Sequence, residues 1–202
     1  MMTKVGAAAL VLALSAPAIA GYKLMPAGAP EVVRSSALTV TPSIDWNRLG
    51  AKVGRNAEAW TLDGQSLNEI TFYAGIADGQ TLFKEVNKKN KPLPRFSARM
   101  LAPEVVQLFE STYRVAASTP LFSIDKVEPA TFLGSQGFRF RYSFTVQDEE
   151  VRRTGEATGA VVDGKLYMIA FEAPTLHYFD RDVGAYEAVV ASAKLGATPA
   201  KR

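Results

Sequence analysis

The chain has 202 residues, a formal net charge of +3, one histidine and no cysteine, and 48% of its residues are hydrophobic. Without cysteine, disulfides and a lipid-modified N-terminal cysteine are excluded, so a hydrophobic core must supply the stability. The small charge does not support nucleic-acid binding. One histidine and no metal-binding motif leave no predicted metal site, and no cofactor motif is present.

The first 20 residues have the layout of a cleaved secretory signal. Lys4 gives a positive start, residues 5–14 are apolar or glycine, and Ala18-Ile19-Ala20 places small residues where a signal peptidase reads. We expect cleavage between Ala20 and Gly21 and a periplasmic or secreted protein. The apolar run is shorter than the roughly 20 residues of a membrane span, so no transmembrane span is expected after cleavage. An uncleaved N-terminal anchor is the alternative.

The domain organisation follows from composition. Residues 21–36 contain Gly21, Pro26, Gly28 and Pro30 among small residues without periodicity, which predicts a flexible linker. Residues 37–196 have the length and patterning of a single domain, and residues 197–202 are predicted to be a disordered tail.

The first half of the domain alternates as strands. An extended segment at residues 38–46 is interrupted by Pro42, which cannot donate to a sheet ladder. A second strand, at 58–62, leads to the turn signal Asp63-Gly64. Residues 69–76 are apolar on one face and polar on the other, which predicts a sheet covered on one side only. The polar face consists of Glu69, Thr71 and Tyr73.

A basic, irregular segment and a helix follow the turn signal Asp78-Gly79. Residues 84–99 contain two prolines and show no periodicity. Pro103 suits the first turn of a helix. The apolar stripe of this helix is Val105, Val106, Phe109, Thr112, Tyr113 and Ala116.

The second half returns to strands after Pro120. Its strongest alternation is Phe138, Phe140, Tyr142, Phe144 and Val146. A strand of small residues runs to the turn signal Asp163-Gly164, and residues 166–171 are apolar on both faces, as in a central strand. A last helix is predicted at about residues 179–194.

The order of strands, helix, strands, helix indicates an α+β fold, with an antiparallel sheet and two main helices packed on one face. We expect the face that holds Phe138 to Val146 to contact the apolar stripes of both helices.

Both ends of the domain resemble the PsbP-like fold. The opening Thr41-Pro42-Ser43-Ile44-Asp45-Trp46 is similar to its strand-Pro-x-x-x-Trp pattern, and the ending from Leu166 to the Ser192-Ala193-Lys194-Leu195 close is similar as well. Ala193 stands where the family usually has Phe. The resemblance covers roughly residues 38–195 and implies an adaptor or assembly protein without shared catalytic residues. The middle, residues 60–76, resembles small secreted proteins of Gram-negative bacteria whose activity is not characterised.

One candidate interaction surface stands out in the irregular segment. The segment contains six basic residues and one acidic residue, Glu85. Its apolar residues either tether the loop to the core or make it a binding edge; they are Phe83, Leu93 and Phe96. A solvated loop is the alternative to a contact with an envelope protein or an anionic envelope component. The bases are Lys84, Lys88, Lys89, Lys91, Arg95 and Arg99. An open sheet edge is the second candidate surface.

Catalysis has little support. His177 is the only histidine, and Gly134-Ser135-Gln136-Gly137 lacks the spacing of a nucleophile elbow. The sequence therefore predicts a non-catalytic binding or accessory module of the cell envelope. A small secreted hydrolase that uses His177, and a carrier that encloses an apolar ligand, are the alternatives.

Overall fold

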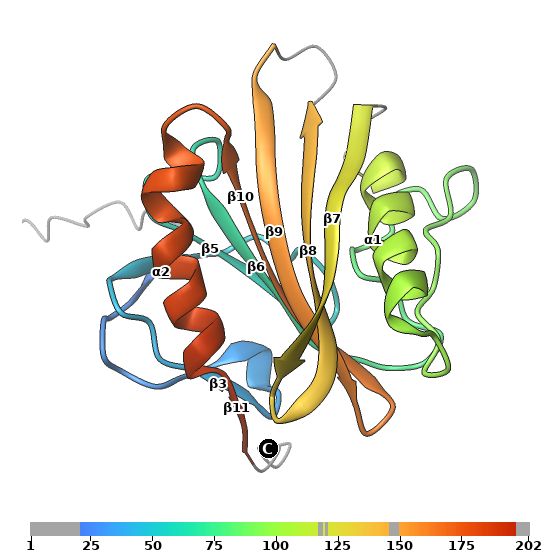
Figure 1. Ribbon diagram of the computed structural model, residues 1–202, viewed down its shortest axis with the longest axis horizontal. Coiled ribbons are helices and arrows are strands. Elements are labelled where there is room, and N and C mark those ends of the chain that lie inside the picture. Colours follow the sequence, from blue (N-terminus) through green and yellow to red (C-terminus); the bar gives the residue numbers. More distant parts are fainter. Residues whose placement is uncertain (1–20, 117–118, 120, 146–149, 197–202) are drawn as a thin grey trace, which may run out of the picture.

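The computed structural model describes residues 21–116, 119, 121–145 and 150–196 (Figure 1). Within these residues, eight strands form one antiparallel sheet and three short strands form a second. The large sheet has the order β1 (Tyr22–Met25), β4 (Trp46–Leu49), β5 (Ala57–Thr61), β6 (Glu69–Ile76), β10 (Lys165–Pro174), β9 (Arg152–Val162), β8 (Ser135–Thr145) and β7 (Leu121–Phe132). The small sheet has the order β11 (Lys194–Leu195), β3 (Leu38–Val40) and β2 (Glu31–Val32).

The predicted α+β class and antiparallel sheet are confirmed, but the helices lie on opposite faces rather than on one. α1 (Ala102–Ala116) packs against β7 and β8, whereas α2 (Tyr178–Ser192) packs against β9 and β10 from the other side (Figure 1). The physical reason lies in β10, whose two faces are both apolar and both need cover. Leu166, Met168 and Ala170 belong to the core under α1, and Tyr167, Ile169, Phe171 and Ala173 to the core under α2.

Strand β6 shows the same correction. Glu69, Thr71 and Tyr73, which the alternation placed on an open polar face, are all buried. They share the α1 side of the sheet with the β10 residues that pair with them. The sheet is therefore covered on both sides at its centre.

Aromatic side chains fill the core under α1. The ring centroid of Phe109 lies 5.1 Å from those of Phe140 and Tyr142 and 4.6 Å from that of Tyr113. The alternating stripe of β8 thus contacts α1, as expected, but not α2; Val146 lies outside the described residues. Gly155 on β9 makes room for this core, because a Cβ at this position would overlap the ring of Tyr142.

The core under α2 includes the N-terminal residues. The Phe171 ring lies 5.7 Å from both Phe179 and Tyr186. Residues 21–36, predicted to be a flexible linker, instead form β1, β2 and the 3-10 turn η1 (Val33–Ser35). Met25 and Val33 are buried in this core, so the apolar residues scattered among the prolines and glycines decide the structure. The expected signal (1–20) and tail (197–202) lie outside the described residues.

Two tight hairpin turns join the long strands. Asp163 and Gly164 both have positive φ (49° and 70°), which confirms the predicted turn. Leu133 and Gly134 adopt a similar conformation between β7 and β8, where a leucine hid the turn from sequence reasoning. Within the described residues, no helix has the length and hydropathy needed to cross a membrane.

Candidate functional site

The basic loop, residues 84–99, is fixed to the α1 side of the domain. Leu93 and Phe96 are buried, and the Phe83 ring meets the Tyr113 ring edge-on at 5.3 Å between centroids. These apolar residues therefore tether the loop to the core, which is one of the two roles that the sequence left open. Tethering holds the backbone of the loop in place while its basic side chains are exposed.

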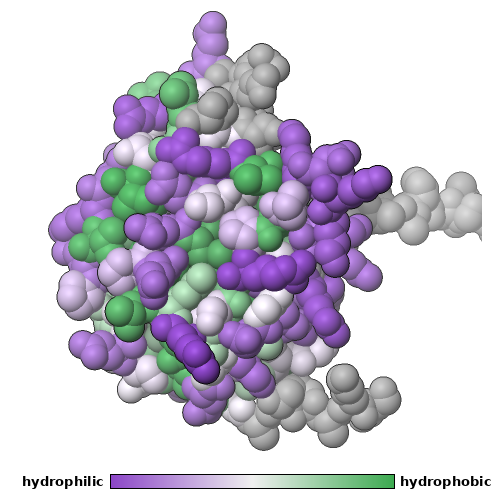
Figure 2. All heavy atoms as spheres, turned by 90° about the vertical axis from the view of Figure 1, so that its right-hand side faces the viewer, coloured by the Kyte–Doolittle hydropathy of each residue, from purple (hydrophilic) through white to green (hydrophobic). Residues whose placement is uncertain are grey.

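All six bases of the basic loop are exposed, but they differ in their partners. Arg95 donates to the Glu85 carboxylate at 3.1 Å and to the Gly79 carbonyl at 2.7 Å, so it holds the shape of the loop. The other five form no ion pair with any residue that the structure describes: Lys84, Lys88, Lys89, Lys91 and Arg99. Val86 is 93% exposed among them. Figure 2 looks onto this side, where hydrophobic residues are scattered over a largely hydrophilic surface.

The open sheet edge, the second candidate surface, is blunted along β7. The pairing register shifts between Ile124 and Lys126, and Pro129 has no N–H to offer a further strand. Arg114 of α1 also donates to the Phe122 carbonyl at 2.7 Å. A bulge, a proline and an occupied carbonyl are devices that protect edge strands from pairing with another chain. β7 is therefore a poor docking edge.

His177 stands at the start of α2 in a strained turn. Its φ is 72°, and the Tyr178 N–H donates to the Leu176 carbonyl across it at 2.9 Å. The imidazole meets the Tyr178 ring edge-on at 5.2 Å. Among the described residues, no serine hydroxyl or carboxylate forms a hydrogen bond with this imidazole. Among the described residues, His177 therefore lacks the hydrogen-bonded nucleophile that the hydrolase alternative requires.

A pair of carboxylates in the α1 core escaped the sequence reasoning. Glu69 on β6 and Glu172 on β10 are cross-strand partners. Oε2 of Glu172 accepts hydrogen bonds from the hydroxyls of Tyr113 at 2.7 Å and Tyr142 at 3.3 Å. The Tyr73 hydroxyl is buried and has no hydrogen-bond partner among the described residues. The pair was missed because Glu69 was assigned to a solvated face.

Burial and the second carboxylate change the acidity of this pair. Burial, followed by the nearby Glu69 charge, raises the pKa of Glu172 to about 7. Burial also raises the pKa of Glu69, although the Thr71 hydroxyl donates to it at 2.8 Å. The described residues contain no group of three or more side chains suited to hold a metal. Glu172 joins the sheet to α1 through its hydrogen bond from Tyr113.

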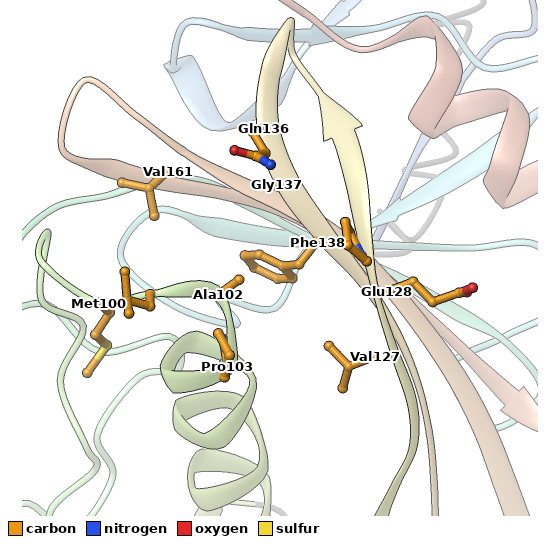
Figure 3. A pocket seen from close by; sticks show the side chains of 11 residues that line it. Met100, Ala102, Pro103, Val127, Glu128, Gln136, Gly137, Phe138 and Val161 are labelled. Atoms are coloured by element: carbon orange, nitrogen blue, oxygen red, sulfur yellow. The ribbon is translucent and has the colours of Figure 1, made fainter.

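A hollow of about 530 Å³ opens between the start of α1 and the β7–β8 ribbon (Figure 3). The side chain of Phe138 extends toward Ala102 and Pro103, with Val127 and Val161 on either side, whereas the Glu128 carboxylate points away. The lining comes from four separate segments, so no local pattern in the sequence marks it. These segments are Met100–Pro103, Val127–Pro129, Gln136–Phe138 and Val161.

Comparison with known proteins places the architecture. No family model and no curated protein sequence matches the chain. Among solved structures, the chain is similar to cyanobacterial PsbP (CyanoP) from Synechocystis, with a TM-score of 0.52 and 13% identity over 95% of this chain and 99% of that one. The chain has a PsbP-like fold. LpqN of Mycobacterium tuberculosis, described as involved in cell envelope biogenesis, is matched at a TM-score of 0.34 and 10% identity over 88% of this chain and 92% of that one.

The predicted PsbP-like fold is thus confirmed, and it positions the candidate surfaces. α1 stands between the basic loop and the β7–β8 ribbon, and its first turn borders the hollow (Figures 1 and 3). The chemistry available at the loop is the positive charge of five bases that form no ion pair with any described residue, and at the hollow it is apolar surface. Both suit binding.

Proposed function

We propose that this protein is a non-catalytic binding or accessory module of the cell envelope. It acts in the periplasm or outside the cell and contacts an envelope protein or an anionic envelope component through the basic loop. The observation that carries the proposal is the combination of a tethered backbone with five exposed bases that lack an ion pair among the described residues. The PsbP-like fold supports it, because its resemblance implies adaptor and assembly roles.

The energetics favour several weak contacts that act together. A single exposed ion pair is worth about 0–1 kcal/mol, so no one lysine of the loop can hold a partner. Lys88, Lys89 and Lys91 lie within four consecutive residues and are all exposed, so they concentrate three positive charges in one short segment. Their combined attraction is screened within about 8 Å at physiological ionic strength. Binding through the loop is therefore expected to weaken steeply with salt.

Crosslinking in intact cells, followed by mass spectrometry, identifies the contact. Capture of the identified component is then measured with the purified protein and with the variant Lys88→Glu, Lys89→Glu, Lys91→Glu. The control variant Lys23→Glu, Lys52→Glu, Lys165→Glu makes the same change of charge at exposed lysines outside the loop.

We expect the loop variant to lose at least about tenfold in affinity, and the control to lose much less, with the melting temperature of both unchanged. Equal capture by the loop variant and the wild-type protein would remove the basic loop from the proposal. No second function is favoured: His177 has no catalytic partner among the described residues, and the hollow opens to solvent instead of enclosing a ligand.

A further inference from the structure

The tip of the basic loop, residues 84–91, is closed by hydrogen bonds of its own. The Asn87 carbonyl accepts from the Lys91 N–H at 2.8 Å, and the Asn87 side-chain oxygen accepts from the Asn90 N–H at 3.2 Å. Asparagine favours turns because its side chain bonds to neighbouring backbone N–H groups in this way. Lys88 and Lys89 therefore lie at the corner of a closed turn, and this loop tip presents them in a fixed place.

The one acid of the loop tip is already engaged. Oε1 of Glu85 accepts from the Leu93 N–H at 3.3 Å, and Oε2 pairs with the Arg95 guanidinium group at 3.1 Å. Both oxygens of this carboxylate thus hold the shape of the loop. The four lysines of the loop tip form no ion pair with any described residue: Lys84, Lys88, Lys89 and Lys91.

An apolar side chain stands among these lysines. Val86 is 93% exposed, so the fold leaves it almost wholly in water. It lies two residues from Lys84 on one side and from Lys88 on the other. The segment between β6 and α1 loops out beyond α1 on the side away from the sheet (Figure 1). A surface that meets the loop tip therefore meets positive charge and an apolar group together.

The composition of the loop tip suits a lipid surface better than a folded protein. The cores of protein interfaces are enriched in aromatic residues, methionine and arginine and depleted in lysine, but residues 84–91 contain four lysines and none of the enriched types. Lysine is a compact charge on a flexible stem and lacks the fork with which arginine grips a single carboxylate. Clusters of such charges are attracted to the phosphate groups of anionic lipids, while their stems lie along apolar surface.

We infer that the loop tip binds the surface of a bilayer that contains anionic phospholipid. The lysine ammonium groups lie among the lipid phosphate groups, and the Val86 side chain enters the boundary between the head groups and the acyl chains. The inference rests on the proposed function, because it names the anionic envelope component that the basic loop contacts. Each lysine close to such a surface strengthens binding about fivefold, so the contact is peripheral and reversible.

Co-sedimentation with vesicles tests the charge. We expect the purified protein to bind vesicles of phosphatidylglycerol and phosphatidylcholine at least about tenfold more tightly than vesicles of phosphatidylcholine alone. Lys88→Gln, Lys89→Gln should weaken binding to the anionic vesicles about twentyfold, because two lysines are lost. The control Lys23→Gln, Lys194→Gln removes the same charge at exposed lysines of β1 and β11 and should change binding less than about threefold. The melting temperatures of both variants should stay at the wild-type value.

Val86 has a test of its own. Val86→Trp changes a side chain that stands in water, so the fold is kept, and the variant should bind anionic vesicles at least about threefold more tightly. Its fluorescence should move to shorter wavelength on binding, because the indole leaves water. Leu176→Trp, at a residue 87% exposed between β10 and α2, is the matched control and should show no such change. A tryptophan at position 86 whose emission stays the same on bound vesicles would overturn the inference.

The remaining outcomes separate this inference from the proposed function. All variants share residues 1–20, so a difference between them comes from the substituted positions. The inference fails if Lys88→Gln, Lys89→Gln binds anionic vesicles as the wild-type protein does. It also fails if the lysines are needed to capture a crosslinked protein while anionic vesicles are not bound; the proposed function then stands, with an acidic protein as the partner. Loop variants that keep both capture and vesicle binding contradict both.

Discussion

The carboxylate pair under α1 makes the stability of the protein depend on pH. Glu172, with its pKa raised from 4.5 to about 7, binds its proton more tightly in the folded state than in the unfolded chain. A carboxyl of this kind contributes most stability below pH 4.5 and loses it as the pH rises through 7. Folding is therefore expected to be weaker at pH 8 than at pH 5.

The size of the loss follows from linkage. Each tenfold difference in proton affinity is worth about 1.4 kcal/mol, and the two pKa values give a fall in the free energy of unfolding of about 2–3 kcal/mol between pH 5 and pH 8. Glu172 retains partial exposure, so solvent screening reduces the expected fall to about 2 kcal/mol. Glu69, whose pKa is also raised, acts in the same direction.

Glu172→Gln isolates the effect. The glutamine carbonyl can still accept from Tyr113 and Tyr142, but the side chain no longer titrates. Urea unfolding at pH 5, 6, 7 and 8, followed by the fluorescence of the buried Trp46 and Trp60, gives the free energies. Between pH 5 and pH 8, the free energy of unfolding of the variant should fall by about 2 kcal/mol less than that of the wild-type protein. Glu150→Gln, an exposed control, should keep the wild-type slope; a wild-type profile that is flat or rises toward pH 8 refutes the reasoning.

Four further substitutions test the packing. Gly155→Ala should destabilise the protein by about 2 kcal/mol or more, because the added methyl group overlaps the Tyr142 ring. Gly184→Ala in α2 meets nothing within 4 Å and should stabilise the protein by about 0.5–1 kcal/mol. Urea unfolding that ranks the two variants otherwise contradicts the packing described. Asn68→Ala removes a buried carboxamide that makes five hydrogen bonds at the β5–β6 turn and to α2. Thermal unfolding should show that the free energy of unfolding falls by about 2–4 kcal/mol. A fall below about 1 kcal/mol would count against this network. Phe96→Ala should cost about 3–5 kcal/mol and speed cleavage within residues 84–91 in limited proteolysis; an unchanged cleavage rate would show that Phe96 does not tether the loop.

The patterns that specify local structure predicted most of the fold. The helix from Pro103 to Ala116 and the strand at residues 69–76 are confirmed nearly to the residue, because their periodicities are 3.6 and 2. Placement of the helices was wrong, because alternation shows which residues share a face but not whether the other face is also covered. The apolar side chains on both faces of residues 166–171 indicated a sheet that is covered on both faces.

The candidate sites also differ in how far the sequence could predict them. The basic loop is contiguous in sequence, so composition alone revealed it. The hollow and the Glu69–Glu172 pair are assembled from segments far apart in the chain, and only the pairing of β6 with β10 and the position of α1 bring them together. Residues 21–36 were misjudged because four prolines and glycines hid the contacts of Met25 and Val33 with the core.

Burial of both faces of the sheet divides the hydrophobic interior into two compartments, and no buried side chain among residues 21–116, 119, 121–145 and 150–196 belongs to both. One holds α1 and the anchors of the basic loop; the other holds α2 and the N-terminal strands that begin directly after the expected cleavage site. Local opening free energies differ between such cooperative units of a protein. A ligand that rigidifies the α1 compartment can thus change the dynamics of the loop and helix while the strands nearest the expected cleavage site stay as they are.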